Sequence, residues 1–317
     1  MAGMIRAGNG SRFLLLGFLT VIVVVLSLVS EFFLSWENLR NILNQSSLFI
    51  MLAVGMSFVV ASGGIDLSVG NLAALSGVVM AVLMKAGLGV PAAVAAGFFV
   101  AILAGLANGA LISLLGINPF ITTLATMSLT RGVALILTGG VSIYGFPASF
   151  KFWGSGSVWG VNPAILIAWI LAAMGMVLMG RTVWGKYSLA LGGNAEALRR
   201  SGANVSAYRI SIYCFSAFCA ACAGLVMTAR LNSAAPLAGA GYEMDAIAAV
   251  VLGGASMKGG RASVFGTFVA CIVMGVIRNG LTMLAVPVYY QQIFTGLVIL
   301  SAVILSEFRG SQGEAVL

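Results

Sequence analysis

The stretch AAVAAGFFVAILAGLANGALISLL, residues 92–115, contains no charged side chain and decides the fold class. A run of this length crosses the roughly 30 Å hydrocarbon core of a membrane as one α-helix. The whole chain shares this character, because 61% of its 317 residues are hydrophobic and only 8% are charged. A soluble domain carries roughly 25% charged residues. The sequence therefore predicts an all-α integral membrane protein.

Apolar runs recur on both sides of this stretch and predict about ten membrane-spanning helices. Several runs are short or interrupted by glycine or proline, which predicts broken helices. The first run lacks a cleavage site of the A-x-A type, so we interpret it as a retained helix and not as a signal peptide. We expect one membrane domain over residues 12–306, with tails at 1–11 and 307–317. The predicted spans are 12–30, 47–62, 68–86, 92–115, 121–139, 163–180, 210–229, 244–256, 262–284 and 289–306.

Basic residues between the spans predict the orientation of the chain. An even number of spans places both termini on the same side. Cytoplasmic loops carry an excess of Lys and Arg, and a cytoplasmic N-terminus puts the larger basic set inside, so both termini are predicted to be cytoplasmic. The inner set is Arg6, Arg12, Arg181, Lys186, Arg199, Arg200, Arg209, Lys258, Arg261 and Arg309, and the outer set is Arg40, Lys85, Lys151 and Arg230.

Two short similarities between the halves of the chain predict an inverted internal repeat. MKAG at 84–87 resembles MKGG at 257–260, and the Asn-Gly pair at 108–109 recurs at 279–280. This pairing relates the third to fifth spans to the eighth to tenth. Because the offset of five spans is odd, the two copies face opposite sides of the membrane. Inverted repeats are typical of transporters, in which the pathway lies at the repeat interface.

Polar residues interrupt the apolar runs at two places. GGIDLSVG at 63–70 carries Asp66 and Ser68 and is followed by Asn71. These side chains either cap the next helix or form a polar element that lines or braces a pathway. NPFITT at 118–123 offers an amide and hydroxyls beside an aromatic ring, which suits either a sugar or an ordinary proline-led helix start. The pathway or helix-break candidates here are Asp66, Ser68, Asn71, Asn118, Phe120 and Thr122.

Asp245 completes this set of candidates and lies close to a second acid, Glu243. Two carboxylates could serve as a glycosidase couple or a proton relay. At positions i and i+2 of a helix, however, they point to different faces. Attraction to the positive end of a helix dipole is the simpler interpretation.

Several function classes are disfavoured by what the sequence lacks. GRTVWGKY at 180–187 nearly matches a phosphate-binding loop, but Tyr187 replaces the Ser/Thr that would hold Mg²⁺ and the segment follows a membrane helix. The chain has no histidine, and its four cysteines lie in apolar runs as small core residues. We therefore expect no catalytic activity, cofactor or metal in this chain, and no nucleic-acid partner.

The segment 181–209, RTVWGKYSLALGGNAEALRRSGANVSAYR, is the polar exception in the second half of the chain. Asn194 can cap a short helix that places Glu196 in its first turn, and Gly202 can end it. The alternative is a plain basic loop that only sets topology. Matched caps favour a cytoplasmic docking helix comprising Gly193, Asn194, Ala195, Glu196, Ala197, Arg199, Arg200 and Gly202.

Three motifs resemble the permease subunit of ribose-type ABC sugar importers, a family related to the permeases of branched-chain amino acid importers. They are GGIDLSVG at 63–70, GGNAEALRRSGANV at 192–205 and DAIAAVVLGGASMKGGRASVFGT at 245–267. Their order fits that family over roughly residues 38–306, although Ala262 stands where family members often have glycine. The resemblance implies that the helix at 194–202 sits in a cleft of a separate ATP-binding subunit.

The resemblance also implies the remaining partners and the location. They are a second permease chain (identical or different), a periplasmic sugar-binding protein and a bacterial inner membrane, with ATP and Mg²⁺ bound by the ATPase. We therefore predict a monosaccharide permease for a pentose, hexose or related polyol. Alternatives are a permease for a nucleoside, an autoinducer-type sugar derivative or a branched-chain amino acid. An ion-coupled secondary transporter is a third possibility, for which Asp66, Glu243 and Asp245 are the candidate coupling groups.

Overall fold

The computed structural model describes residues 16–300 apart from 18, 288, 292, 294, 295, 298 and 299, so both predicted tails and the ends of the first and last predicted spans lie outside it. An apolar helix covers Leu19–Val29. The further helices are α2 (Trp36–Ala61), α3 (Val69–Lys85), α4 (Val90–Leu114), α5 (Pro119–Thr138), α6 (Ala148–Ser155), α7 (Pro163–Arg181), α8 (Val183–Arg200), α9 (Val205–Leu231), α10 (Tyr242–Leu252) and α11 (Val264–Met283). Two short strands, β1 (Ile143–Tyr144) and β2 (Ser233–Ala234), pair antiparallel.

Six of the described helices are long and apolar enough to cross a membrane, which confirms a multi-pass helical protein. These six are α2, α4, α5, α7, α9 and α11. Helix α3 and the helix Leu19–Val29 are shorter apolar helices, and α10 has only 11 residues. About ten spans and an inverted repeat therefore stay predictions, whereas short helices are confirmed.

Several helices start where short polar side chains cap them. Asn118 Oδ1 accepts from Phe120 N at 2.9 Å, and Asn162 Oδ1 accepts from Ala164 N at 2.8 Å. Each asparagine precedes a proline that occupies the first turn of the helix, where its missing N–H costs nothing. These residues mark the starts of α5 and α7 and confirm the proline-led helix start predicted at 118–123.

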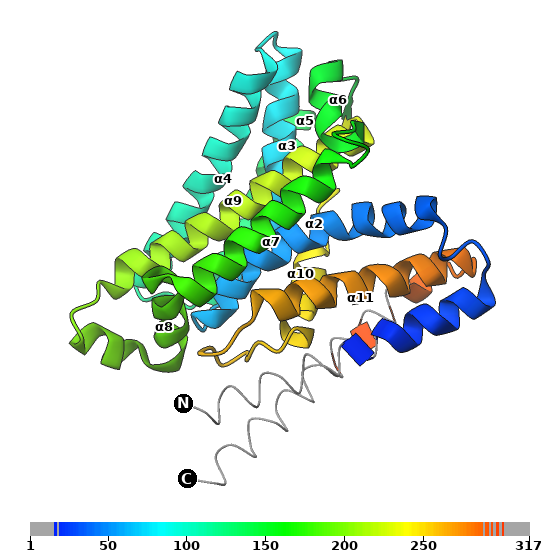
Figure 1. Ribbon diagram of the computed structural model, residues 1–317. Helices are drawn as coiled ribbons and strands as arrows, with labels where there is room; N and C mark the ends of the chain where they lie inside the picture. The colour runs from blue at the N-terminus through cyan, green and yellow to red at the C-terminus, as the bar shows by residue number, and fades with distance from the viewer. Residues whose placement is uncertain are drawn as a thin grey trace.

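Helices α2 and α9 form the centre of the bundle. α9 packs against α2, α3 and α4, while α2 also contacts α7, α10 and α11. Figure 1 shows α8 at one end of the bundle and α6 at the opposite end. We call these the α8 end and the α6 end.

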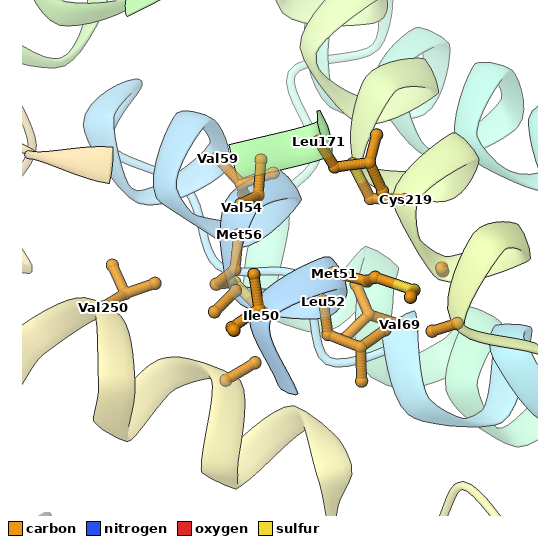
Figure 2. Packing of buried hydrophobic residues seen from close by; sticks show 14 of the residues in the cluster. Ile50, Met51, Leu52, Val54, Met56, Val59, Val69, Leu171, Cys219 and Val250 are labelled. Atoms are coloured by element: carbon orange, nitrogen blue, oxygen red, sulfur yellow. The ribbon is translucent and has the colours of Figure 1, made fainter. Parts of the chain in front are cut away.

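Apolar side chains leave α2 in every direction because neighbouring helices surround it. Figure 2 shows side chains of α2 within one buried cluster that also includes residues of α3, α7, α9 and α10. Such all-round burial explains why the second half of this helix lacks a polar face. The labelled members are Ile50, Met51, Leu52, Val54, Met56, Val59, Val69, Leu171, Cys219 and Val250.

Small residues spaced by four let α4 approach its neighbours closely. A Cβ added to Gly105 would lie 2.6 Å from Tyr213 O, and one added to Gly109 would lie 2.6 Å from Ile210 Cα. Ala101 precedes them on the same face and is fully buried. Small-xxx-small spacing of this kind allows backbone contact between membrane helices.

We expect Gly105→Leu to destabilise the chain strongly, because its side chain has no room between α4 and α9. Overpacking typically costs about 1–3 kcal/mol, and backbone atoms on the facing helix make relief difficult. Gly132→Leu on α5 is the matched control, since no atom outside its own helix neighbourhood lies within 4 Å of its added Cβ. Thermal unfolding of the detergent-purified chain measures both, and equal melting temperatures would contradict this packing.

Several elements differ from the prediction. Helix α2 begins at Trp36 and not at residue 47, because Ser35 Oγ accepts from Asn38 N at 3.3 Å and starts the helix in the polar segment WENLRN. Helix α6 and the β1–β2 pair were not predicted, since residues 139–162 and the loop that holds β2 lack a long apolar run. Helix α8 begins 11 residues before Asn194.

Candidate functional site

Helix α8 bends sharply at Asn194 and its second half forms a short capped helix. Asn194 has φ −157° and ψ 93° inside an otherwise helical segment. Its Oδ1 accepts from Ala197 N at 2.9 Å, and Gly202 follows the helix with φ +86°, a conformation that glycine adopts readily. The predicted caps at both ends are present, although the docking role stays a prediction.

The first half of α8 fixes this short helix to the bundle. Leu191 and Leu198, on either side of the bend, are buried with Val205 of α9. Tyr187 and Tyr208 pack against this cluster, with ring centroids 4.9 Å apart. This anchor was not predicted from the sequence, because residues 181–209 were treated as one polar segment although several residues of 183–193 are apolar.

The outer face of the short helix is charged and open to solvent. Glu196 lies 3.2 Å from Arg200 and 4.0 Å from Arg199, measured between carboxylate oxygen and guanidinium nitrogen. These side chains are 58%, 80% and 70% exposed. Ion pairs this exposed stabilise a helix by only about 0.3–0.5 kcal/mol. Their charges are therefore available to a partner.

Glycines from two loops and from helix α8 meet beside the bend, at a point that we call the glycine junction. Gly260 N donates to Ala61 O at 3.0 Å. A Cβ on Gly259 would lie 2.8 Å from Gly63 Cα and 2.9 Å from Gly192 Cα. Gly63, Gly259 and Gly260 also have positive φ. The α2–α3 loop, the α8 bend and the α10–α11 loop thus touch through backbone atoms.

Asp66 lies just past this junction as a buried hydrogen-bond acceptor at the start of α3. Its Oδ1 accepts from Ser68 N at 3.0 Å and from Ser68 Oγ at 2.5 Å. Its Oδ2 accepts from Ser216 Oγ of α9 at 3.0 Å. Asp66 is 1% exposed. This carboxylate therefore holds the turn before α3 and joins it to α9, although α3 itself has no side-chain cap bond. A role in a pathway stays a prediction.

The bonds continue from Ser68 into α4 and α5. Asn108 Nδ2 donates to Ser68 Oγ at 3.3 Å, and Thr126 Oγ1 donates to Asn108 Oδ1 at 2.5 Å. We call Asp66, Ser68, Asn108, Thr126 and Ser216 the Asp66 network. Ser216, Asn108 and Thr126 were not predicted as partners, because they lie in three different spans and no local pattern links them to Asp66. Their intramembrane position was the one available signal.

The other predicted polar residues lie apart from this carboxylate. Asn71 Nδ2 donates to Met127 O at 3.1 Å. Asn118 caps α5, and Thr122 Oγ1 donates back to Asn118 O at 3.1 Å. Phe120 is 49% exposed. Among the described residues, no hydrogen bond joins the group at 118–122 to Asp66, so the structure does not gather the predicted residues into one site.

The two acids of α10 point to different surroundings, as their spacing predicts. Both lie in the first turn of α10, which favours carboxylates. Glu243 Oε1 accepts from Gly241 N at 3.2 Å. Asp245 Oδ1 instead accepts from Arg278 Nη2 of α11 at 2.9 Å. The sequence placed Arg278 within a span but did not identify this ion pair.

Comparisons with known proteins cover nearly the whole chain. The family described as branched-chain amino acid transport system / permease component matches residues 38–303. The ribose import permease protein of Haemophilus influenzae is 38% identical over 298 residues, 93% of this chain and 92% of that protein. The corresponding Bacillus subtilis protein is 40% identical over 296 residues, 92% of each chain. The D-allose transport system permease protein of Escherichia coli is 39% identical over 289 residues, 90% of this chain and 89% of that protein. No solved structure matches the chain.

The matched region includes all three motifs from which the resemblance was inferred, and each contributes to the architecture above. GGIDLSVG supplies Gly63 and Asp66, while the second and third motifs supply the bend at Asn194 and Gly259. The predicted resemblance to sugar import permeases is thereby confirmed. The chain belongs to the family of branched-chain amino acid transport system permease components, and it is a multi-pass membrane protein of that family.

Proposed function

We propose that this chain is the permease subunit of an ATP-driven importer in a bacterial inner membrane and forms the pathway for a monosaccharide. Its partners are a second permease chain, an ATPase that binds ATP and Mg²⁺, and a periplasmic sugar-binding protein. Both termini and the α8 end face the cytoplasm. The observation that carries the proposal is similarity over about nine-tenths of the chain to proteins named as ribose and D-allose permeases.

The short helix at 194–202 is the contact for the ATPase. It projects from the α8 end with charged side chains that are more than half exposed. Leu191 and Leu198 pack against Val205 of α9, so that a movement of the ATPase against the short helix is transmitted to α9. Charge complementarity between such a surface and a cleft governs association.

We expect Arg200→Glu to weaken association with the ATPase subunit by on the order of tenfold, because reversing an interfacial charge leaves a repulsive contact. Lys186→Glu is the control, since it reverses an exposed basic charge in the half of α8 before the bend. Co-purification of the ATPase and its stimulated ATP hydrolysis are the measurements. Equal association of both variants would remove the docking role from this helix.

A further inference from the structure

A charged and aromatic cluster lies apart from the short helix at 194–202, the glycine junction and the Asp66 network. The Asp245–Arg278 ion pair joins α10 to α11, with side chains 12% and 30% exposed. The guanidinium carbon of Arg278 lies 4.7 Å from the ring centroid of Phe49 in α2. The Phe49 and Tyr242 rings meet edge to face, with centroids 5.3 Å apart and an interplanar angle of 66°. Three helices therefore supply one carboxylate, one guanidinium and two aromatic rings.

Arg278 of this cluster lies within a helix that is long and apolar enough to cross a membrane. At a rise of ~1.5 Å per residue, Arg278 is about 21 Å along α11 from Val264, in a helix of about 30 Å. A guanidinium that faces lipid is costly, and intramembrane charges face water or protein instead. Because Arg278 is 30% exposed on this single chain, its open side faces a water-filled pathway or a second permease chain. Lipid is the unfavourable neighbour.

A further polar contact joins α9 to α2, five residues before Phe49. Arg230 Nη1 of α9 donates to Asn44 O of α2 at 3.1 Å. Asn44 Oδ1 is buried without a hydrogen-bond partner in the described part of the chain. An unsatisfied buried oxygen costs about 1–3 kcal/mol, which a hydroxyl-bearing ligand or water would recover.

These groups match the chemistry of a sugar. A monosaccharide presents hydroxyls that both donate and accept, and C–H faces that pack on aromatic rings. Arg278 has five N–H donors in a fixed fork, and the described structure gives one of them to Asp245. A carboxylate accepts up to about four hydrogen bonds, so Asp245 retains capacity beside its ion pair. Binding sites for small molecules combine a few such polar groups with apolar walls.

We propose that Asp245 and Arg278 hydrogen-bond the hydroxyls of the monosaccharide during its passage, with Phe49 and Tyr242 as the apolar wall beside it. The inference rests on the proposed function, because it assigns contact residues to the sugar pathway. The ion pair holds the carboxylate and guanidinium together when no sugar is present. A passing sugar then binds the exposed side of the pair, and the carboxylate and the guanidinium stay paired with each other.

The test uses the reconstituted complex with its ATPase and binding protein. Maximal uptake rates are measured at saturating sugar, so that the affinity of the binding protein does not limit them. Ribose is compared with its single-deoxy analogues. For wild type we expect one deoxy analogue to cross about tenfold more slowly. Arg278→Lys keeps a positive charge beside Asp245 but removes the forked set of N–H donors. We expect this variant to transport ribose about tenfold more slowly, and to transport ribose and the deoxy analogue at the same rate.

Controls separate a sugar contact from a structural role. Glu243→Gln, two residues from Asp245 on the other face of α10, should preserve both the rate and the preference for ribose. Exchange of the pair, Asp245→Arg with Arg278→Asp, should restore stability and ATP hydrolysis but not that preference. If Arg278→Lys and Asp245→Asn both keep the wild-type preference, the inference is wrong. If wild type shows no ATP-driven monosaccharide uptake, the proposed function itself fails.

Discussion

Replacing Gly192 with alanine is expected to lower ATP-driven sugar uptake at least tenfold, while the ATPase still binds. A Cβ at this position would collide with the carbonyl oxygen of Ala61 and lie 2.6 Å from Gly260 N. Backbone atoms cannot rotate away as a side chain can. The bend would therefore move away from the loop that precedes α3 and from the loop that follows α10. The docking helix itself, from Asn194 onward, keeps its caps and its exposed charges.

Gly193→Ala is the matched control for this prediction. The nearest heavy atom to its added Cβ is Gly260 Cα at 3.9 Å, an ordinary contact. We expect this variant to transport near the wild-type rate. The measurements are sugar uptake into proteoliposomes and co-purification of the ATPase. If Gly192→Ala transports like Gly193→Ala, the glycine junction does not transmit movement from the ATPase.

Replacing Asp66 with alanine is expected to cause the largest loss of stability among single polar substitutions. Three donors in two residues, Ser68 N, Ser68 Oγ and Ser216 Oγ, would lose their acceptor inside the bundle. Each unsatisfied buried donor costs about 1–3 kcal/mol. The expected loss is therefore about 3 kcal/mol or more, and the start of α3 would no longer be joined to the middle of α9.

Asp66→Asn supplies the graded comparison. It keeps Oδ1 for Ser68 and places an amide N–H beside Ser216 Oγ, whose hydroxyl can rotate to accept. We expect it to lose roughly a third as much stability as the alanine variant, about 1 kcal/mol for one altered bond. Thermal unfolding in detergent measures both variants. Equal melting temperatures for wild type and Asp66→Ala would show that the Asp66 network does not hold the bundle.

The sequence predicted the long spans well because apolar length alone defines them. The α4 stretch at 90–114 and the α7 stretch at 163–181 agree with prediction to within a few residues. Helix α2 was predicted too short, because its first turns carry Glu37 and Arg40, which hydropathy assigns to a loop. Capping chemistry, with Ser35 as the N-cap, decides that boundary instead.

The sequence predicted the candidate sites in part. The contacts that it missed join residues far apart in the chain. Asn194 and Gly202 are local caps, so their spacing alone indicated the short helix. The partner of Asp66 on α9, Ser216, is 150 residues away in the chain. Arg278 meets Asp245 only through the packing of α11 on α10. Such pairings depend on which helices become neighbours, which no local pattern specifies.

Three glycine pairs illustrate the same limit. The pairs that begin at Gly63, Gly192 and Gly259 were recognised separately as features of three motifs. Their meeting beside the bend of α8 follows from the fold and not from any one segment. The transmission of movement that we propose depends on this contact, because it joins the docking helix to the start of α3 and the end of α10.

ATP-driven uptake by the reconstituted complex tests the central claim most directly. Proteoliposomes would contain this chain with an ATPase subunit, and a sugar-binding protein would be added on the opposite side, with labelled ribose and other pentoses and hexoses as substrates. We predict uptake of at least one monosaccharide that requires ATP, Mg²⁺ and both partners. Uptake by this chain alone, driven by an ion gradient and indifferent to ATP, would contradict the account.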